Sequence, residues 1–251
     1  MALEIPVQDL IPIDNEKEMI QSHFFSATAN WVIPNKLMAG ESPSNPTNVR
    51  ETKDAMFELR LDGKITTFVC LQAEVPPQTS DEDCVDFGGV KLSCSQHGEV
   101  VPTGRANKTV KIILPSYADM ARNVPNVPRP KFVYYGIKDF GVVESLEGLD
   151  VLIQDLVKRV EDGEVLYIHC TAGRGRTGVV VSSILGQLYP NLSAEEVLER
   201  INTYYAVRSK GAGKWVNPSM RSPETESQCQ QVKDYLKFSS QKNAECGCVT
   251  H

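Results

Sequence analysis

The chain has 251 residues, of which 41% are hydrophobic and 23% charged, as in an ordinary globular protein with one sizeable core. Its 26 Lys and Arg residues against 32 Asp and Glu give a net charge of −6, which argues against a nucleic-acid-binding protein held by phosphate contacts. The apolar runs, such as VVV at 179–181, are far shorter than the roughly 20 residues of a membrane-spanning helix.

The N-terminal residues 1–30 are weakly patterned, and we expect them to form an N-terminal extension. They contain no basic stretch followed by an apolar block, so we expect no secretory signal and a cytoplasmic location. The seven cysteines form no regular framework and no CxxC pair, which favours free thiols and makes a structural metal improbable.

Turn residues and hydrophobic periodicity divide the chain into alternating strands and helices. The predicted strands are short, apolar or β-branched, and they lie at 36–40, 65–72, 109–115, 131–137 and 164–170. The predicted helices lie at 49–61, 145–160, 177–189, 193–208 and around 229–236. The helix from 193 opens with the capping box Ser193-Ala-Glu-Glu196. This alternation predicts an α/β fold with crossover helices.

A long stretch from Glu74 to Arg129 is rich in Pro, Gly and Asp. Irregular segments of this length are uncommon in compact domains and are usually either functional or disordered. We therefore treat residues 75–128 as an insert in the domain.

The segment VLYIHCTAGRGRTGVVV, residues 165–181, places a glycine-rich turn between a strand and a helix. Backbone N–H groups at a helix start have no intrahelical partners and carry partial positive charge, so they suit an anion. Gly173 and Gly175 allow successive N–H groups to converge on phosphate oxygens. Arg176 adds a guanidinium fork for two of those oxygens.

Cys170 is the first residue of this turn. A helix N-terminus and neighbouring cations favour the thiolate form of a cysteine, which is its nucleophilic form. The hydroxyl of Thr177 would also stabilise a thiolate, and His169 would order the loop through a ring N–H. The pocket thus offers a nucleophile and a cradle for a phosphoryl group, as phosphoryl transfer to sulfur requires.

Three other interpretations fit this segment less well. A purely structural turn does not explain Arg174 and Arg176 between apolar segments, since buried charges need partners. Gly173-x-Gly175-x-x-Gly178 matches the dinucleotide fingerprint, which requires a further strand and an acidic residue about 20 positions on. The chain opens another helix at Ser193 instead. A Walker A loop is excluded because no Gly-Lys-Ser/Thr is present.

Residues 169–178, HCTAGRGRTG, fit the pattern H-C-x-x-G-x-x-R-[ST] and resemble the signature of cysteine-dependent protein tyrosine phosphatases in their dual-specificity-like form. The resemblance extends to 31–43, ITTFVCLQAE and 131–208. It implies a single α/β domain over 31–237, with a central, mainly parallel sheet of four or five strands and helices on both faces. Residues 238–251 are then expected to be a disordered tail.

The resemblance also assigns roles to residues of the loop. It implies catalytic roles for Cys170, Arg176 and Thr177, and loop ordering by His169. The residues expected to bind the substrate phosphate are Thr171, Ala172, Gly173, Arg174, Gly175 and Arg176.

The resemblance further implies a general acid about thirty residues before the nucleophile, and Asp139 in GIKDFG lies 31 residues before Cys170. The alternative for Asp139 is a turn-forming residue. Asp150 and Asp155 compete poorly for the acid role because Asp155 lies within a helical run, and Asp119 lies too far back.

The implied reaction is hydrolysis of a phosphate monoester through a cysteinyl-phosphate, without metal or cofactor. The favoured substrates are phosphotyrosine proteins, with phosphoserine and phosphothreonine open. Phosphoinositide phosphatases of this superfamily carry lysines at the positions of Thr171 and Arg174, so a phosphoinositide or another non-protein monoester is an alternative. A phosphate-binding module without catalysis is a remote one.

Three further features of the sequence concern the site and the end of the chain. Glu224 stands where tyrosine-specific members carry a water-positioning glutamine, while Thr225 and Gln228 match that motif. Cys70 is a candidate for a protective disulfide with Cys170, against a simple core role. The end of the chain leaves lipidation at Cys246 or Cys248 as an alternative to an unmodified tail.

Overall fold

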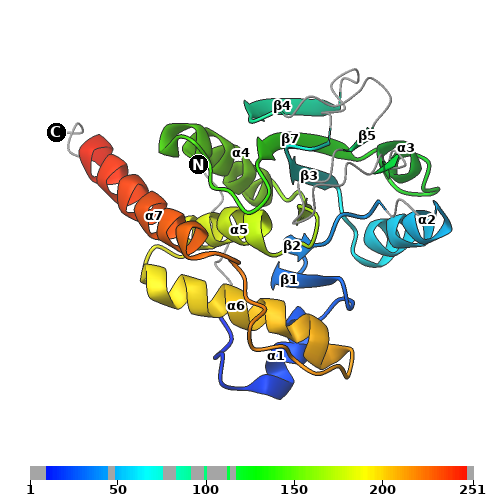
Figure 1. Ribbon diagram of the computed structural model, residues 1–251, viewed down its shortest axis with the longest axis horizontal. Coiled ribbons are helices and arrows are strands. Elements are labelled where there is room, and N and C mark those ends of the chain that lie inside the picture. Colours follow the sequence, from blue (N-terminus) through cyan, green and yellow to red (C-terminus); the bar gives the residue numbers. More distant parts are fainter. Residues whose placement is uncertain are drawn as a thin grey trace.

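A computed structural model describes residues 10–44, 49–75, 83–91, 99–100, 112–113 and 117–247. Its centre is a six-stranded sheet of order β1-β2-β8-β3-β7-β4 (Figure 1). The strands are β1 (Ala29–Ile33), β2 (Leu37–Gly40), β3 (Thr67–Gln72), β4 (Cys84–Gly89), β7 (Lys131–Ile137) and β8 (Leu166–His169). Only β1, at one edge, runs antiparallel to its neighbour, and the other four pairings are parallel.

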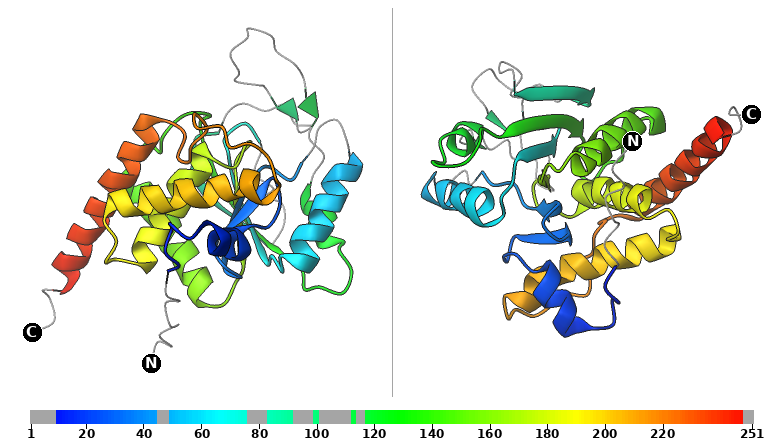
Figure 2. Two further views of the ribbon diagram at one scale, coloured as in Figure 1. Left: turned by 90° about the horizontal axis from the view of Figure 1, so that it is seen from below. Right: turned by 180° about the vertical axis from the view of Figure 1, so that it is seen from behind.

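Helices cover both faces of this sheet (Figures 1 and 2). One face carries α4 (Leu146–Glu161), α5 (Gly175–Leu188) and α6 (Ala194–Gly211), and α7 (Glu226–Gly247) packs outside α5. The other face carries α2 (Val49–Phe57), the π-helical turn η1 (Glu58–Asp62) and α3 (Tyr117–Arg122). Along the described segments, no helix is both long enough and apolar enough to cross a membrane.

The alternation of side chains along β3 and β8 produces two separate cores. Val69 and Ile168 point into the core beneath α4, α5 and α6, whereas Phe68 and Tyr167 point into the core beneath α2 and α3. Strands that are buried on both faces need continuous apolar sequence, which explains the run at 65–72. The predicted α/β class with a mainly parallel sheet is confirmed.

The sheet has six strands rather than the expected four or five, because β1 and β4 were not predicted as strands. β4 comes from the expected insert and pairs with β7 as an edge strand. It includes Asp86 and two glycines, so its sequence lacks the apolar pattern of the central strands. Of the predicted strand at 109–115, Ile112–Ile113 form β6, paired with β5 (Glu99–Val100), and the rest lies outside the described residues.

Both ends of the described chain contain helices. α1 (Glu16–His23), within the expected N-terminal extension, is capped by Asn15 and packs against α6. The expected disorder of the tail is corrected for residues 238–247, which continue α7. Two contacts explain this: Ser239 is buried and bonded to Gln187, and Lys242 pairs with Asp150 on α4.

Candidate active site

The loop that joins β8 to α5, residues 170–174, lies at the carboxyl edge of the parallel strands, where open α/β sheets bind ligands. Gly173 has a φ of +62°, and a Cβ there would lie 2.1 Å from the Gly40 carbonyl oxygen, so only glycine fits. Arg174 occupies the N-cap position of α5 and makes no capping hydrogen bond with its side chain. The first N–H groups of α5 therefore remain available to an anion.

Cys170 begins this loop, with 3% of its surface exposed and its thiol free. The hydroxyl of Thr177, one turn into α5, is also buried, and no hydrogen-bond partner for it exists among the residues that the structure describes. The expected contact of this hydroxyl with the sulfur stays a prediction.

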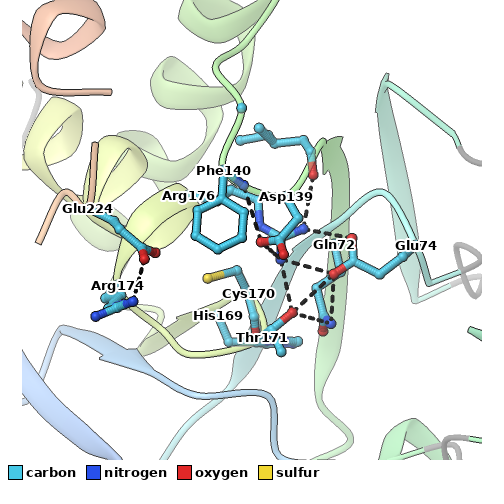
Figure 3. Close-up of polar contacts among 12 residues, drawn as sticks. Gln72, Glu74, Asp139, Phe140, His169, Cys170, Thr171, Arg174, Arg176 and Glu224 are labelled. Carbon is cyan, nitrogen blue, oxygen red and sulfur yellow. Dashed lines mark hydrogen bonds and ion pairs between the residues drawn. The ribbon is translucent and has the colours of Figure 1, made fainter. Parts of the chain in front are cut away.

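Arg176 is the most constrained charged group of the site, with only 1% of its side chain exposed. Its Nη1 and Nη2 donate to the two carboxylate oxygens of Glu74 at 2.7 and 2.9 Å, and Nη1 also donates to the Ile137 carbonyl at 3.0 Å (Figure 3). Burial would lower the pKa of Arg176, but Glu74 reverses this, so the guanidinium stays charged. Nη2 also donates to Asp139 at 3.0 Å and to Thr171 at 2.9 Å, so a ligand that binds this side of the guanidinium has to displace one of these acceptors.

Glu74, which follows β3, was not predicted as a site residue. Burial would raise the pKa of its carboxyl group, but the bonds from Arg176 outweigh burial and hold that pKa below its usual range. The hydroxyl of Thr171 donates to Glu74 at 3.0 Å and accepts from Arg176 at 2.9 Å. A sequence signal existed: an acidic residue at the end of a buried parallel strand must lie near the loop edge of the sheet.

Asp139 follows β7 and reaches the same guanidinium, with its Oδ1 3.0 Å from Nη2 of Arg176. Its side chain is 31% exposed, and Figure 3 shows it pointing toward the signature loop together with Phe140. The other candidate acids are engaged elsewhere. Asp119 pairs with Arg122 on α3, Asp150 is bonded to Tyr235 and Lys242, and Asp155 pairs with Arg159 within α4.

His169 is fully buried, and its two ring nitrogens have different partners. Nδ1 lies 3.3 Å from the Cys170 carbonyl oxygen, which can only accept, so Nδ1 carries the proton. Nε2 then accepts a hydrogen bond from the Tyr117 hydroxyl at 2.8 Å. Burial lowers the pKa of His169 to about 4, so the ring is neutral at pH 7. Tyr117 lies in the expected insert and was not predicted.

The middle of the signature loop is held by Arg208, which reaches it from α6 and is itself buried. Arg208 donates to the carbonyls of Ala172, at 3.5 Å, and Gly173, at 3.0 Å, and to the side chain of Asn30 at 2.7 Å. These contacts turn the carbonyls of the loop away from its N–H groups. Arg208 was not singled out because its role depends on the packing of α6.

The segment 221–228 contacts the opposite side of the loop. Glu224 forms an ion pair with Arg174, as Figure 3 shows, and Ser222 donates to the Arg174 carbonyl at 2.9 Å. Thr225 caps α7, because its hydroxyl oxygen accepts a hydrogen bond from the Gln228 N–H at 3.2 Å. Glu224 thus acts as the counter-ion of a loop arginine in this structure.

Cys70 and Cys170 point to opposite faces of the sheet. Cys170 belongs to the core beneath α5, whereas Cys70 lines a small cavity with Tyr117 and Phe132 on the face covered by α3. Burial raises the pKa of the Cys70 thiol to about 12. A disulfide between the two would require rearrangement of the sheet edge, and a core role for Cys70 fits better.

In the part of the chain that the structure describes, no three His, Cys, Asp or Glu side chains are grouped so that they could hold a metal ion.

Comparisons with known proteins give one match in sequence and many in structure. The protein 067L of Invertebrate iridescent virus 3, named as a candidate tyrosine phosphatase, is 32% identical over 82 residues, which cover 32% of this chain. The aligned part spans only 34% of that relative's length. No protein-family model matches.

Two solved structures illustrate the structural matches. The crystal structure of PTPMT1 is 17% identical, with a TM-score of 0.47, and the match covers 84% of this chain and 96% of that one. The kinase associated phosphatase KAP, with its catalytic cysteine replaced by serine, is 13% identical, with a TM-score of 0.49, and the match covers 81% and 87%. Together, the signature loop and the viral relative confirm the resemblance of this chain to the cysteine-dependent protein tyrosine phosphatases.

Proposed function

We propose that this protein hydrolyses phosphate monoesters through a cysteinyl-phosphate intermediate. One observation carries the proposal. Arg176 is fixed by Glu74 along one edge of its guanidinium, and it joins the loop that begins with Cys170 to the carboxylate of Asp139. Cys170, the loop and Asp139 lie together at the carboxyl edge of the sheet, which supports their roles as nucleophile, anion-binding loop and proton donor (Figure 3).

In the first step, the phosphoryl oxygens bind the N–H groups of the loop and the edge of Arg176 that faces away from Glu74. These oxygens take the place of Asp139 on Nη2 of Arg176. The carboxyl group of Asp139 is then free to face the leaving oxygen. The Cys170 thiolate attacks phosphorus, the bond from phosphorus to the ester oxygen breaks, and Asp139 gives that oxygen its proton. Arg176 and the loop N–H groups stabilise the charge on the transferred group.

In the second step, water attacks the phosphorus of the cysteinyl-phosphate. Asp139, now a carboxylate, takes a proton from this water, the bond from sulfur to phosphorus breaks, and inorganic phosphate leaves. The leaving sulfur becomes a thiolate again, and the Thr177 hydroxyl, which bonds to none of the described residues, can donate to it. The role of Arg208 is to keep the loop carbonyls turned away from these anions.

The substrate that we propose is a phosphoprotein, with phosphotyrosine favoured. The two positions that carry lysines in phosphoinositide phosphatases are occupied here by Thr171 and by Arg174, whose charge is paired with Glu224. Neither supplies a free cation for a second phosphate. Phe140, which is 45% exposed beside Asp139, offers an aromatic surface for a phenyl ring. A cytoplasmic location remains a prediction, as does an unmodified tail.

The test compares wild type with Cys170→Ser on three substrates: a phosphotyrosine peptide, a phosphothreonine peptide and vesicles that contain a phosphatidylinositol phosphate. We expect the wild type to release phosphate fastest from the phosphotyrosine peptide, and Cys170→Ser to bind this peptide without turnover. Full activity of Cys170→Ser would refute the mechanism. Faster release from the vesicles would favour the lipid alternative, and peptide binding without turnover by the wild type would favour a binding module.

A further inference from the structure

The segment 138–143, here called the acid loop, is attached to α7 through the backbone of Val143. The Val143 N–H donates to Oε1 of Gln231 at 2.9 Å, and Nε2 of Gln231 donates to the Val143 carbonyl at 2.7 Å. The side-chain amide therefore bonds to both backbone groups of one residue, as a neighbouring strand would. Gln231 is only 8% exposed, so water competes little for these bonds.

Gln228, almost one turn earlier in α7, makes a second attachment to the acid loop. Its Nε2 donates to the Gly141 carbonyl at 3.0 Å, and its Oε1 accepts from the N–H groups of Glu224 and Thr225, at 3.1 Å each. Its side chain is fully buried. Gln228 thus joins the acid loop to the same segment that contacts Arg174.

The other end of the acid loop is held by Arg176, in the first turn of α5. Arg176 donates to the Ile137 carbonyl and to the Asp139 carboxylate, both at 3.0 Å. Between the two attachments, Phe140 has a φ of +56°, a backbone conformation that non-glycine residues adopt only where the surroundings impose it. Phe140 lies in a turn that the Gly141 N–H closes by donating to the Lys138 carbonyl at 2.9 Å, and Gln228 and Gln231 hold the C-terminal side of this turn on α7.

We propose that Gln231 is a positioning residue for the general acid: by holding Val143 on α7, it keeps Asp139 where the leaving oxygen can receive its proton. The inference rests on the proposed function. Gln231 touches no reacting atom, and its effect passes through four residues of the acid loop. Losing it removes one of the two attachments of the acid loop to α7 and leaves that of Gln228, so Asp139 is held less firmly while Cys170, Arg176 and Glu74 keep their places.

The experiment measures kcat/KM, which reports the steps up to formation of the cysteinyl-phosphate, on two esters. Phenyl phosphate has a poor leaving group that needs a proton, whereas 2,4-dinitrophenyl phosphate has a leaving group that departs as the anion. The variant Gln231→Met keeps the size of the side chain and removes both hydrogen bonds. The control is Gln230→Met, on the same helix, where the side chain is exposed and donates a hydrogen bond to Asp234.

We expect Gln231→Met to lower kcat/KM for phenyl phosphate by about 10- to 100-fold, a large part of what a positioned acid contributes, and to leave the dinitrophenyl ester within about 3-fold. Gln231→Glu still accepts from the Val143 N–H, so we expect it to lose less on phenyl phosphate than Gln231→Met. The control should match wild type on both esters.

Equal losses on the two esters would overturn the proposal, because they would show a general structural defect. Unchanged cleavage of phenyl phosphate would overturn it as well. If Gln231→Met does not fold, kcat/KM for the two esters is measured on Gln231→Glu instead. A ratio of these two values equal to that of wild type would refute the role. A wild type that cleaves neither ester would instead refute the proposed function, and the positioning role with it.

Discussion

Glu74 and Arg176 are 102 residues apart in the sequence, and they form a buried, two-point ion pair with distances of 2.7 and 2.9 Å. This pair sets the orientation of the guanidinium before any substrate arrives. One edge of Arg176 faces the Glu74 carboxylate, so a phosphoryl group uses the other edge, where it takes the place of Asp139 on Nη2. Pre-organisation of this kind lowers the cost of ordering the side chain when ligand binds.

The first prediction concerns this pair. Glu74→Gln leaves a buried guanidinium without its counter-charge, and removal of one partner from a buried ion pair typically costs about 3–5 kcal/mol. We therefore expect a loss of about 3 kcal/mol in the free energy of unfolding, measured by urea denaturation. Glu161→Gln, at an exposed position at the end of α4, is the matched control and should change little. Equal stability of the two variants would show that Glu74 does not fix Arg176.

The pair also shows how far the sequence could predict the site. The residues from His169 to Gly178 are contiguous, so one strand–loop–helix segment brings them together. Their pattern alone was therefore enough to predict this loop as the candidate site. Glu74, Tyr117 and Arg208 come from other elements, and no spacing along the chain relates them to Cys170. Asp139 was reached only through the resemblance.

The fold was predictable where burial on both faces or helical periodicity left a strong pattern, as in β3, β7 and α4. It was not predictable for β4, an edge strand whose Asp86 and glycines hide its pairing with β7. The end of α7 was missed because Ser239 and Lys242 are polar, and only the tertiary contacts to Gln187 and Asp150 show why the helix continues.

The second prediction concerns the general acid. Asp139→Asn cannot donate a proton to the leaving oxygen, so we expect kcat/KM on phenyl phosphate to fall by about 10²- to 10⁴-fold. Arg176 keeps Glu74 in this variant, so binding of vanadate, measured by calorimetry, should stay close to wild type. Asp119→Asn, at a side chain that is 73% exposed on α3, should retain the full rate. A larger loss in Asp119→Asn than in Asp139→Asn would move the acid role to Asp119.

The third prediction is a pH dependence of stability that comes from His169. Burial lowers its pKa to about 4 in the folded protein, against about 6.5 in an unfolded chain. The unfolded chain therefore binds more protons in this range, and stability is lost as the pH falls from about 6.5 to 4. The full loss from this group is about 3 kcal/mol. His169→Gln removes this contribution, so the difference between its unfolding free energy and that of wild type should narrow over the same range. A constant difference would show that folding does not lower the pKa of His169.

The fourth prediction concerns oxidation of the nucleophile. Cys70 faces the opposite side of the sheet from Cys170, and burial disfavours its thiolate, the form that attacks an oxidised sulfur. We expect Cys70→Ser to be inactivated by peroxide, and reactivated by dithiothreitol, to the same extent as wild type. Loss of reactivation in Cys70→Ser, together with a Cys70–Cys170 disulfide in peptide mapping of oxidised wild type, would show that the sheet edge rearranges and that Cys70 protects Cys170.

The last prediction tests the contribution of residues beyond 237. Asp150 is buried on α4, and its carboxylate accepts from Lys242 at 2.6 Å and from Tyr235 at 3.0 Å. Burial alone would raise the pKa of Asp150, but these bonds outweigh burial and keep that pKa below its usual range. Because Lys242 is 55% exposed, solvent screens part of the attraction, and we expect Lys242→Met to cost about 1 kcal/mol.

The cost should be present at neutral pH and disappear as the pH falls through the pKa of Asp150, because a protonated carboxyl group no longer attracts Lys242. Lys237→Met, at an exposed position on the same helix, is the control and should show no such pH dependence. Chemical denaturation at several pH values measures both variants. If Lys242→Met matched Lys237→Met throughout, the ion pair between Lys242 and Asp150 would add nothing to the stability of the domain, and of the two contacts that explain why α7 continues beyond residue 237, only that of Ser239 with Gln187 would remain.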